Sequence, residues 1–282
     1  MEGIYLVNKT KGITSYDVVR DFKKKTSLKV GHAGTLDPFA EGLLILLVGR
    51  ATKLSNTFLN QSKTYEGVVS FGISTDTFDP TGEVVNKLEN FELTEEAINN
   101  AIKALSGEIT QIPPKYSSIK LKGKKLYEYA RENRDVSIPS RKVFVTFLDY
   151  KLEGSELYFK VDVSKGTYIR SLANDLGEYL GIPSHLKSLK RLSSGPFKLD
   201  DANHDRPFMT LKDYANNLEK LVIKPYLEKL VLNGVYLDER QTKTTNTFSV
   251  YSENKRLLAI YEPFNHKYKP LIIFGEHNES ID

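Results

Sequence analysis

Residues 31–50 read GHAGTLDPFAEGLLILLVGR, and the rest of the chain is organised around this stretch. Residues 31–40 contain two glycines, a proline and three polar side chains, a composition typical of a loop. Residues 42–48 form an apolar run of the length of a buried strand, too short to cross a membrane. A polar loop that leads into a core strand holds its side chains on a rigid support, so we expect the reactive group here.

Asp37 is the carboxylate in this loop, and the proline after it favours an extended or turn conformation. Taken alone, such an aspartate is most often a turn residue that bonds its own backbone. The surrounding string is more specific, because residues 31–38, 42–44 and 49–53 resemble the signature of the bacterial TruB family. Members of that family are tRNA pseudouridine synthases that act on uridine-55 of the T loop. The resemblance implies that Asp37 is the catalytic carboxylate and that His32 lines the same loop and contacts the substrate.

The composition limits the class of protein. A chain of 282 residues with 40% hydrophobic and 27% charged residues is long enough for one large globular domain, or for one domain with a small appendage. The absence of cysteine excludes disulfides and thiolate catalysis and is compatible with a reducing cytosol, so we expect a cytoplasmic protein. The five histidines lack the spacing of metal ligands, and we expect no metal site. A net charge of +4 permits a polyanionic partner, and no segment predicts a membrane partner.

The predicted helices and strands are consistent with an α+β (mixed α/β) fold, the class that the resemblance implies. Thr14 and Asp17 have the spacing of a capping box, which predicts a helix start. Apolar periodicity predicts further helices at 94–106 and from Ile169, and strict alternation predicts a strand at 156–164. The resemblance implies that these elements form a pseudouridine synthase catalytic domain around a largely antiparallel sheet.

Tyr65 lies in a predicted strand, 63–71, where a tyrosine is usually half-buried packing. The pair Lys63-x-Tyr65, followed by the Thr- and Asp-rich loop 75–82, is again similar to the TruB pattern. The resemblance implies that Tyr65 lies against the target base and is catalytic, and that Asp79 helps to hold the flipped nucleotide.

Arg170 lies at the first turn of the helix predicted from Ile169, where a cation is disfavoured by the helix dipole. It should therefore have a carboxylate partner. The string 165–177 resembles the second hallmark of the TruB family, whose arginine pairs with the catalytic aspartate. The resemblance implies an Arg170–Asp37 pair and a substrate contact by Tyr168.

The segment 182–197 resembles the Leu-Arg-Arg-Thr segment of the family, with Lys190 in place of the first arginine. Lysine keeps the positive charge but loses the bidentate geometry of arginine. We expect Lys190 and Arg191 to contact RNA. Leu189 matches the apolar residue that packs near the base, although such a leucine can equally be a core residue.

A tract of basic and aromatic residues lies within 109–142, which we interpret as an RNA-clamping insertion. A charge run is usually a solvated face, but lysines that alternate with tyrosines suit phosphate contact and stacking on unpaired bases. We expect Lys120 and Lys124 to bind RNA. Because residues 121–140 lack apolar periodicity, we expect much of this segment to become ordered only on RNA.

The chain changes character near residue 230, where short strands with turn signals begin. We predict a catalytic domain at 1–228 and a small C-terminal β domain at 229–282. Family members often end in an RNA-binding PUA domain, and this tail is short enough to be a reduced PUA-like version. Its contact with RNA stays open.

The resemblance implies a tRNA pseudouridine synthase that flips the target uridine, starts the reaction with ionised Asp37, whose pKa Arg170 would lower, and needs no cofactor. The expected partner is the T arm of tRNA, without a guide RNA or an obligate protein partner, and the expected state is a monomer. One alternative is a non-catalytic tRNA-binding protein or RNA chaperone. Another is a glycosidase, which normally needs two cooperating carboxylates.

Overall fold

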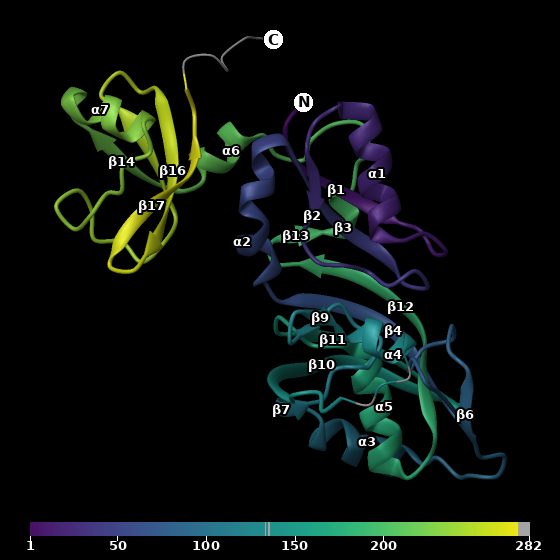
Figure 1. Cartoon of the computed structure of the whole chain (residues 1–282). Coiled ribbons are helices and arrows are strands. Elements are labelled where there is room, and N and C mark those ends of the chain that lie inside the picture. The colour runs from purple at the N-terminus through teal and green to yellow at the C-terminus, as the bar shows by residue number, and fades with distance from the viewer. Residues whose placement is uncertain (133, 135, 276–282) are drawn as a thin grey trace.

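The computed structural model describes residues 1–132, 134 and 136–275 of the chain (Figure 1). Residues 133 and 135, within the predicted insertion, and residues 276–282, at the end of the predicted second domain, lie outside the described residues. Two separate sheets dominate the architecture, a large one and a four-stranded one. Within the described part of the chain, no helix combines the length and the apolar character needed to cross a membrane.

The large sheet has nine strands and the order β1-β3-β12-β4-β11-β10-β7, with β2 beside β3 and β13 beside β12. All of its pairs are antiparallel except the short parallel contact of β12 with β3. The largely antiparallel sheet and the α+β class predicted from the sequence are therefore confirmed. The strands are β1 (Gly3–Lys9), β2 (Val30–His32), β3 (Glu41–Val48), β4 (Lys63–Phe71), β7 (Gly107–Gln111), β10 (Arg141–Glu153), β11 (Glu156–Val163), β12 (Ser184–Ser194) and β13 (Phe197–Lys198).

Two helices, α3 (Glu95–Ala104) and α5 (Ile169–Leu180), cover one face of the half of the sheet formed by β4, β10, β11 and β12 (Figure 1). At the other end, α1 (Ser15–Thr26) packs on one face of β1 and β3. The predicted capping box of α1 is present, with reciprocal bonds between Thr14 and Asp17. The 3-10 helix η1 (Gly49–Leu54) and α2 (Ser55–Leu59) pack on the opposite face of β3. Both faces of β3 are thus buried, as its apolar sequence predicts.

Two short hairpins project from this body. One consists of β5 (Ile73–Thr75) and β6 (Val84–Lys87), and the other of β8 (Lys120–Leu121) and β9 (Lys124–Lys125), which leads into α4 (Leu126–Arg131). In the structure the first half of 121–140 forms β9 and α4, where Leu126 is buried and the Glu128 carboxylate caps the backbone N–H of Lys125. Ordering of this segment on RNA stays a prediction.

The C-terminal sheet consists of β14 (Glu219–Ile223), β15 (Phe248–Ser252), β16 (Leu257–Phe264) and β17 (Lys267–Ile273). It stands beside the large sheet and is reached through η2 (Leu199–Asp201) and α6 (Leu211–Asn216), while α7 (Pro225–Leu232) packs on it (Figure 1). The predicted boundary at 228/229 falls inside α7, and β14 pairs with β15 before that point. We therefore propose a boundary just before β14.

Candidate active site

A cavity of about 440 Å³ lies where the polar loop 31–40, called the catalytic loop below, meets β4, β12 and the start of α5. We call it the catalytic-loop cavity. Segments far apart in the sequence meet there, and six of the residues singled out from the sequence line it. They are Asp37, Tyr65, Tyr168, Arg170, Leu189 and Arg191.

Asp37 and Arg170 form an ion pair in this cavity, as the sequence predicts. Arg170 Nε lies 2.9 Å from Asp37 Oδ2, and its Nη2 lies 3.5 Å from Asp37 Oδ1. The Arg170 guanidinium also donates to the backbone carbonyls of Thr77 and Tyr116, at 3.0 and 2.9 Å. Its side chain is only 6% exposed, so these contacts fix it in one orientation.

The pKa of Asp37 differs in direction from the sequence-based expectation. Burial raises the pKa of the Asp37 carboxyl above its ordinary value, and this outweighs the lowering effect of Arg170. The negative charge of Asp79 raises it further. Because the Asp37 side chain is still 37% exposed, water relieves part of the cost of ionisation. Arg170 thus limits the rise in the Asp37 pKa, and its clearer role is orientation.

Asp79 is enclosed by protein and does not line the cavity, so the structure does not support the predicted contact with the flipped nucleotide. Its Oδ1 accepts hydrogen bonds from Thr77 Oγ1 at 2.8 Å, from the Thr81 N–H at 2.9 Å and from Thr81 Oγ1 at 2.5 Å. Its Oδ2 lies 3.4 Å from Arg170 Nη1. Asp79 therefore contacts Arg170 and helps to hold it in place. The spacing of residues in an aspartate-rich loop could not predict this contact.

Tyr65 and Leu189 lie on neighbouring strands and form part of the cavity wall, each almost fully buried. Gly67 is the register partner of Leu189 in the pairing of β4 with β12 and follows Tyr65 by two positions. A side chain there would collide, since a Cβ would lie 2.6 Å from Ser188 O and 2.8 Å from the Phe159 ring. The glycine thus lets the two strands and the Phe159 ring pack closely beside Leu189.

Tyr168 is the N-cap residue of α5, and Gln111 fixes its backbone. The Tyr168 N–H donates to Gln111 Oε1 at 2.8 Å, and Gln111 Nε2 donates to the Tyr168 carbonyl at 3.1 Å. Burial raises the pKa of the Tyr168 hydroxyl, so this group stays protonated at neutral pH. It can offer a hydrogen bond in the cavity but no negative charge.

Two predicted RNA contacts lie away from the cavity. His32 is on β2, and the residues of its loop that line the cavity begin only at Gly34. Lys190 alternates with Leu189 along β12 and therefore faces the other side of the sheet, where it lies 3.4 Å from Glu66. There it lines an outer cavity of about 420 Å³, together with Lys151 and Tyr158. The alternation of β12 thus removes Lys190 from the predicted site.

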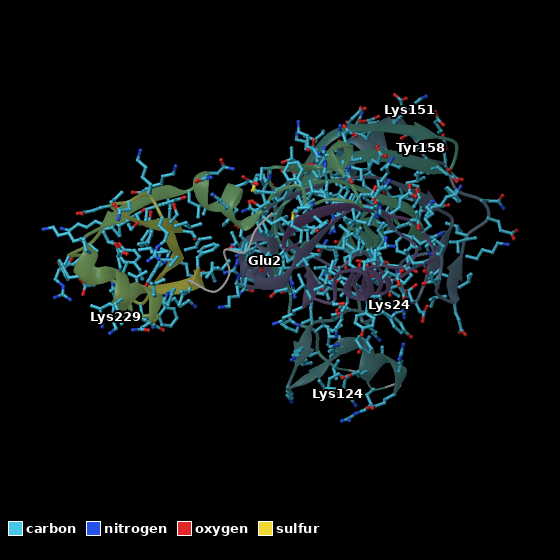
Figure 2. All side chains as sticks on the ribbon, turned by 90° about the horizontal axis from the view of Figure 1, so that it is seen from above. Glu2, Lys24, Lys124, Lys151, Tyr158 and Lys229 are labelled. Carbon is cyan, nitrogen blue, oxygen red and sulfur yellow. The ribbon has the colours of Figure 1, made fainter. Side chains whose placement is uncertain are left out.

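The basic tract adopts a different arrangement from the one expected. Lys124 pairs with Glu132 and lies 5.3 Å from the centre of the Tyr129 ring. The Tyr127 ring has Lys125 and Arg131 as cationic neighbours, each at 5.4 Å. These cations compete with bases for the ring faces, so stacking on unpaired bases is less available than the sequence suggests. Lys120 is exposed, and Figure 2 shows Lys124 on the side of the molecule opposite Lys151 and Tyr158.

Sequence reasoning gave no role to Lys63 and missed Lys9. Lys63 lines the cavity, and the i, i+2 spacing from Tyr65 on a strand could have placed it on the same wall. Lys9 is fully buried, and its ammonium donates to the carbonyls of Thr10, Ile13 and, at 3.5 Å, Pro38. It ties the end of β1 to the catalytic loop, a role that no local pattern signals.

Comparisons with known proteins show which family this chain resembles. The family model described as "TruB family pseudouridylate synthase (N terminal domain)" matches residues 20–169. The tRNA pseudouridine synthase B of Acholeplasma laidlawii is 42% identical over 97% of this chain and 100% of that protein. The protein of the same name from Bacillus thuringiensis strain Al Hakam is 39% identical over 93% of this chain and 92% of its own length.

Solved structures show the same fold. A chain in the crystal structure of a Cbf5-Nop10-Gar1 complex matches with a TM-score of 0.66 and 24% identity, over 97% of this chain and 84% of that one. A chain in the structure of an H/ACA RNP bound to a substrate RNA containing 2'-deoxyuridine matches with a TM-score of 0.62, 24% identity and coverage of 93% and 78%. These two likenesses concern the fold alone. The family match and the sequence identities show that this chain belongs to the TruB family of pseudouridylate synthases.

Proposed function

We propose that this protein isomerises uridine-55 in the T loop of tRNA to pseudouridine, as a cytoplasmic monomer without a guide RNA or a protein partner. The observation that carries the proposal is the Asp37 carboxylate, held 2.9 Å from Arg170 in a cavity also lined by Tyr65 and Leu189. The names of the relatives, tRNA pseudouridine synthase B, support tRNA as the substrate.

The dimensions of the cavity suit one nucleotide rather than a folded RNA. A volume of about 440 Å³ is at the small end of ligand sites. A uridine within a stacked loop cannot bring its sugar and base to Asp37, so we infer that the target nucleotide is flipped out of the stack. Tyr65 and Leu189 would offer it an aromatic and an apolar surface.

The reaction breaks the N1–C1′ bond, turns the base and joins C5 to C1′, while the C5 proton is lost and N1 gains a proton. Atoms and electrons balance within the substrate, so no oxidant or reductant is needed. Asp37 would start the reaction by attacking the sugar or the base, or by taking the C2′ proton. Tyr65 would remove the C5 proton late in the reaction, directly or through water.

A tritium-release assay tests the proposal. A T-arm stem-loop labelled at uridine C5 should lose tritium at the target position on incubation with the protein alone, without guide RNA. Asp37→Asn should abolish release and leave RNA affinity almost unchanged, because it removes the charge and keeps the shape of the side chain. Asp149→Asn, at an exposed position on the outer face of the sheet, is the matched control and should retain full activity.

Three outcomes would contradict this proposal. Substantial release by Asp37→Asn would exclude Asp37 as the essential carboxylate. Tight binding without release by the unaltered protein would favour a non-catalytic tRNA-binding protein or RNA chaperone. Release only after addition of a guide RNA or protein fraction would exclude independent action.

A further inference from the structure

Lys63 on β4 and Arg191 on β12 form one wall of the catalytic-loop cavity. Neither lies on the elements that carry the Asp37–Arg170 pair. Arg191 on β12 is the register partner of Tyr65 on β4, and Lys63 precedes Tyr65 by two positions on the same strand face. The two cations therefore lie beside the aromatic ring expected to face the base.

Arg191 is buried, and its hydrogen bonds to the described residues use two of its three guanidinium nitrogens. Its side chain is among the largest fully buried ones, at 1% exposure. Its Nε donates to Leu43 O at 2.7 Å and its Nη2 donates to Gly34 O at 3.0 Å. Lys63 Nζ donates to Gln61 O at 2.7 Å and to Leu59 O at 3.2 Å. An ammonium has three protons, so one remains for a group in the cavity.

These two cations lack a counter-charge in the part of the chain that the structure describes. No carboxylate there lies within 4.0 Å of Lys63 or Arg191, whereas Arg170 contacts two. Burial and the charge of Arg191 lower the pKa of Lys63 to about 8. Arg191 also lowers the pKa of His32 and Lys9. A buried positive charge without a partner is costly, which points to an anion as the missing ligand.

The catalytic loop closes around these cations at Gly34. This glycine has a φ of +101°, and a Cβ there would lie 3.3 Å from Arg191 Nη1 and 3.6 Å from Lys63 Cε. The absence of a side chain leaves the two cations close to the loop backbone and to each other. Gly34, Lys63 and Arg191 all line the cavity.

We propose that Lys63 and Arg191 form a phosphate subsite, which binds a backbone phosphate next to the target nucleotide. The identification of this phosphate as RNA rests on the proposed function. A flipped nucleotide carries its two flanking phosphates to the mouth of its pocket, where charge-assisted hydrogen bonds from lysine and arginine would hold one of them. This explains why unmatched positive charge is built into the wall beside Tyr65.

The competing explanation is structural. Arg191 joins Gly34 O to Leu43 O, so it also ties the catalytic loop to β3, and its replacement could misplace Asp37. Lys63 is the better probe because it is partly exposed and bonds only carbonyls of the preceding turn. Lys103, an exposed lysine of α3 outside the cavity, provides the matched control.

The experiment combines protein variants with RNA in which single phosphates are neutral. T-arm stem-loops carry one methylphosphonate, either 5′ or 3′ of the target uridine, and binding is measured by fluorescence anisotropy at several salt concentrations. Lys63→Gln should weaken binding of unmodified RNA about tenfold, the usual contribution of one charge-assisted hydrogen bond. The slope of log K against log salt should fall by about one. Lys103→Gln should change neither.

The decisive result is the coupling between protein and RNA changes. On RNA that is neutral at one of the two positions, Lys63→Gln should cause no further loss. Equal losses on unmodified RNA and on both neutral RNAs would overturn the subsite, as would a wild-type protein indifferent to both methylphosphonates. Binding reports the subsite even without turnover, whereas tritium release by the wild type reports the proposed function, so the two failures can be told apart.

Discussion

Replacement of Arg170 by methionine is the most informative single change in this structure. Arg170 is 6% exposed and contacts two carboxylates, at 2.9 Å to Asp37 and 3.4 Å to Asp79. Methionine keeps much of the side-chain volume and removes all charge. Asp37 can turn toward water, but Asp79 is only 3% exposed and would stay behind as a buried carboxylate without its cation.

The expected loss of stability follows from Asp79. Removal of one partner from a buried ion pair typically costs about 3–5 kcal/mol, because the other charge remains buried. The three hydrogen bonds from Thr77 and Thr81 to Asp79 Oδ1 reduce this cost, so we expect a loss near the lower end, about 3 kcal/mol. Neutralising the remaining carboxylate in Arg170→Met/Asp79→Asn should recover about 1–2 kcal/mol.

Urea unfolding of the four proteins of this double-mutant cycle measures these free energies, with Arg20→Met as a control for loss of a surface arginine paired with Asp17. Single-turnover pseudouridine formation on a T-arm stem-loop measures the effect on chemistry. Loss of Arg170 should raise the pKa of Asp37 further, so activity should fall more at pH 6 than at pH 8. A loss of stability under 1 kcal/mol, with no coupling to Asp79, would refute this reasoning about the buried charges.

Two further predictions concern the support of the site. Gly67→Ala should destabilise the protein by about 1–3 kcal/mol and lower turnover, because the new Cβ would collide with Ser188 O and the Phe159 ring. Urea unfolding and turnover assays measure both effects, and Gly275→Ala, which adds a Cβ in open space, is the control. Burial and the charge of Glu178 raise the pKa of Asp175 to about 7. The folded state therefore keeps a proton that the unfolded state loses near pH 4, so the free energy of unfolding falls as the pH rises from about 4 to about 7. Asp175→Asn should remove this dependence and be more stable than the wild type at pH 8, by no more than about 4 kcal/mol; an equal difference at pH 4 and pH 8 in urea unfolding would contradict the assignment.

Elements with local signals could be predicted from the sequence. The capping box at Thr14 and Asp17 forms within one turn, and α5 begins at the predicted Ile169. The position of β12 could not be predicted, because this strand pairs antiparallel with β4 and parallel with β3, contacts that depend on distant segments. The same applies to β14, whose partner β15 follows only after α7 and a long connection.

In the candidate site, too, some features could be predicted from local strings and others depend on distant segments. Asp37, Tyr65 and Arg170 each belong to a distinctive string, and the structure brings all three to one cavity. Lys190 and Asp79 belong to similar strings, yet one faces the outer side of the sheet and the other is enclosed behind Arg170. A motif identifies residues near a site, whereas the side that each residue faces depends on strand pairing and loop closure.

The charges of the catalytic-loop cavity differ from one wall to another. On one wall, Arg170 is matched by Asp37 and Asp79, and the proposed function would present this oriented carboxylate to the sugar. On another wall, Lys63 and Arg191 have no carboxylate partner among the described residues, which favours an anion there. A nucleotide that enters with its base against Tyr65 and its phosphate toward Lys63 avoids placing that phosphate beside Asp37, where repulsion would oppose binding. Under the proposed function, the arrangement would select one orientation of the nucleotide before chemistry begins, which is how fixed charges contribute most to catalysis.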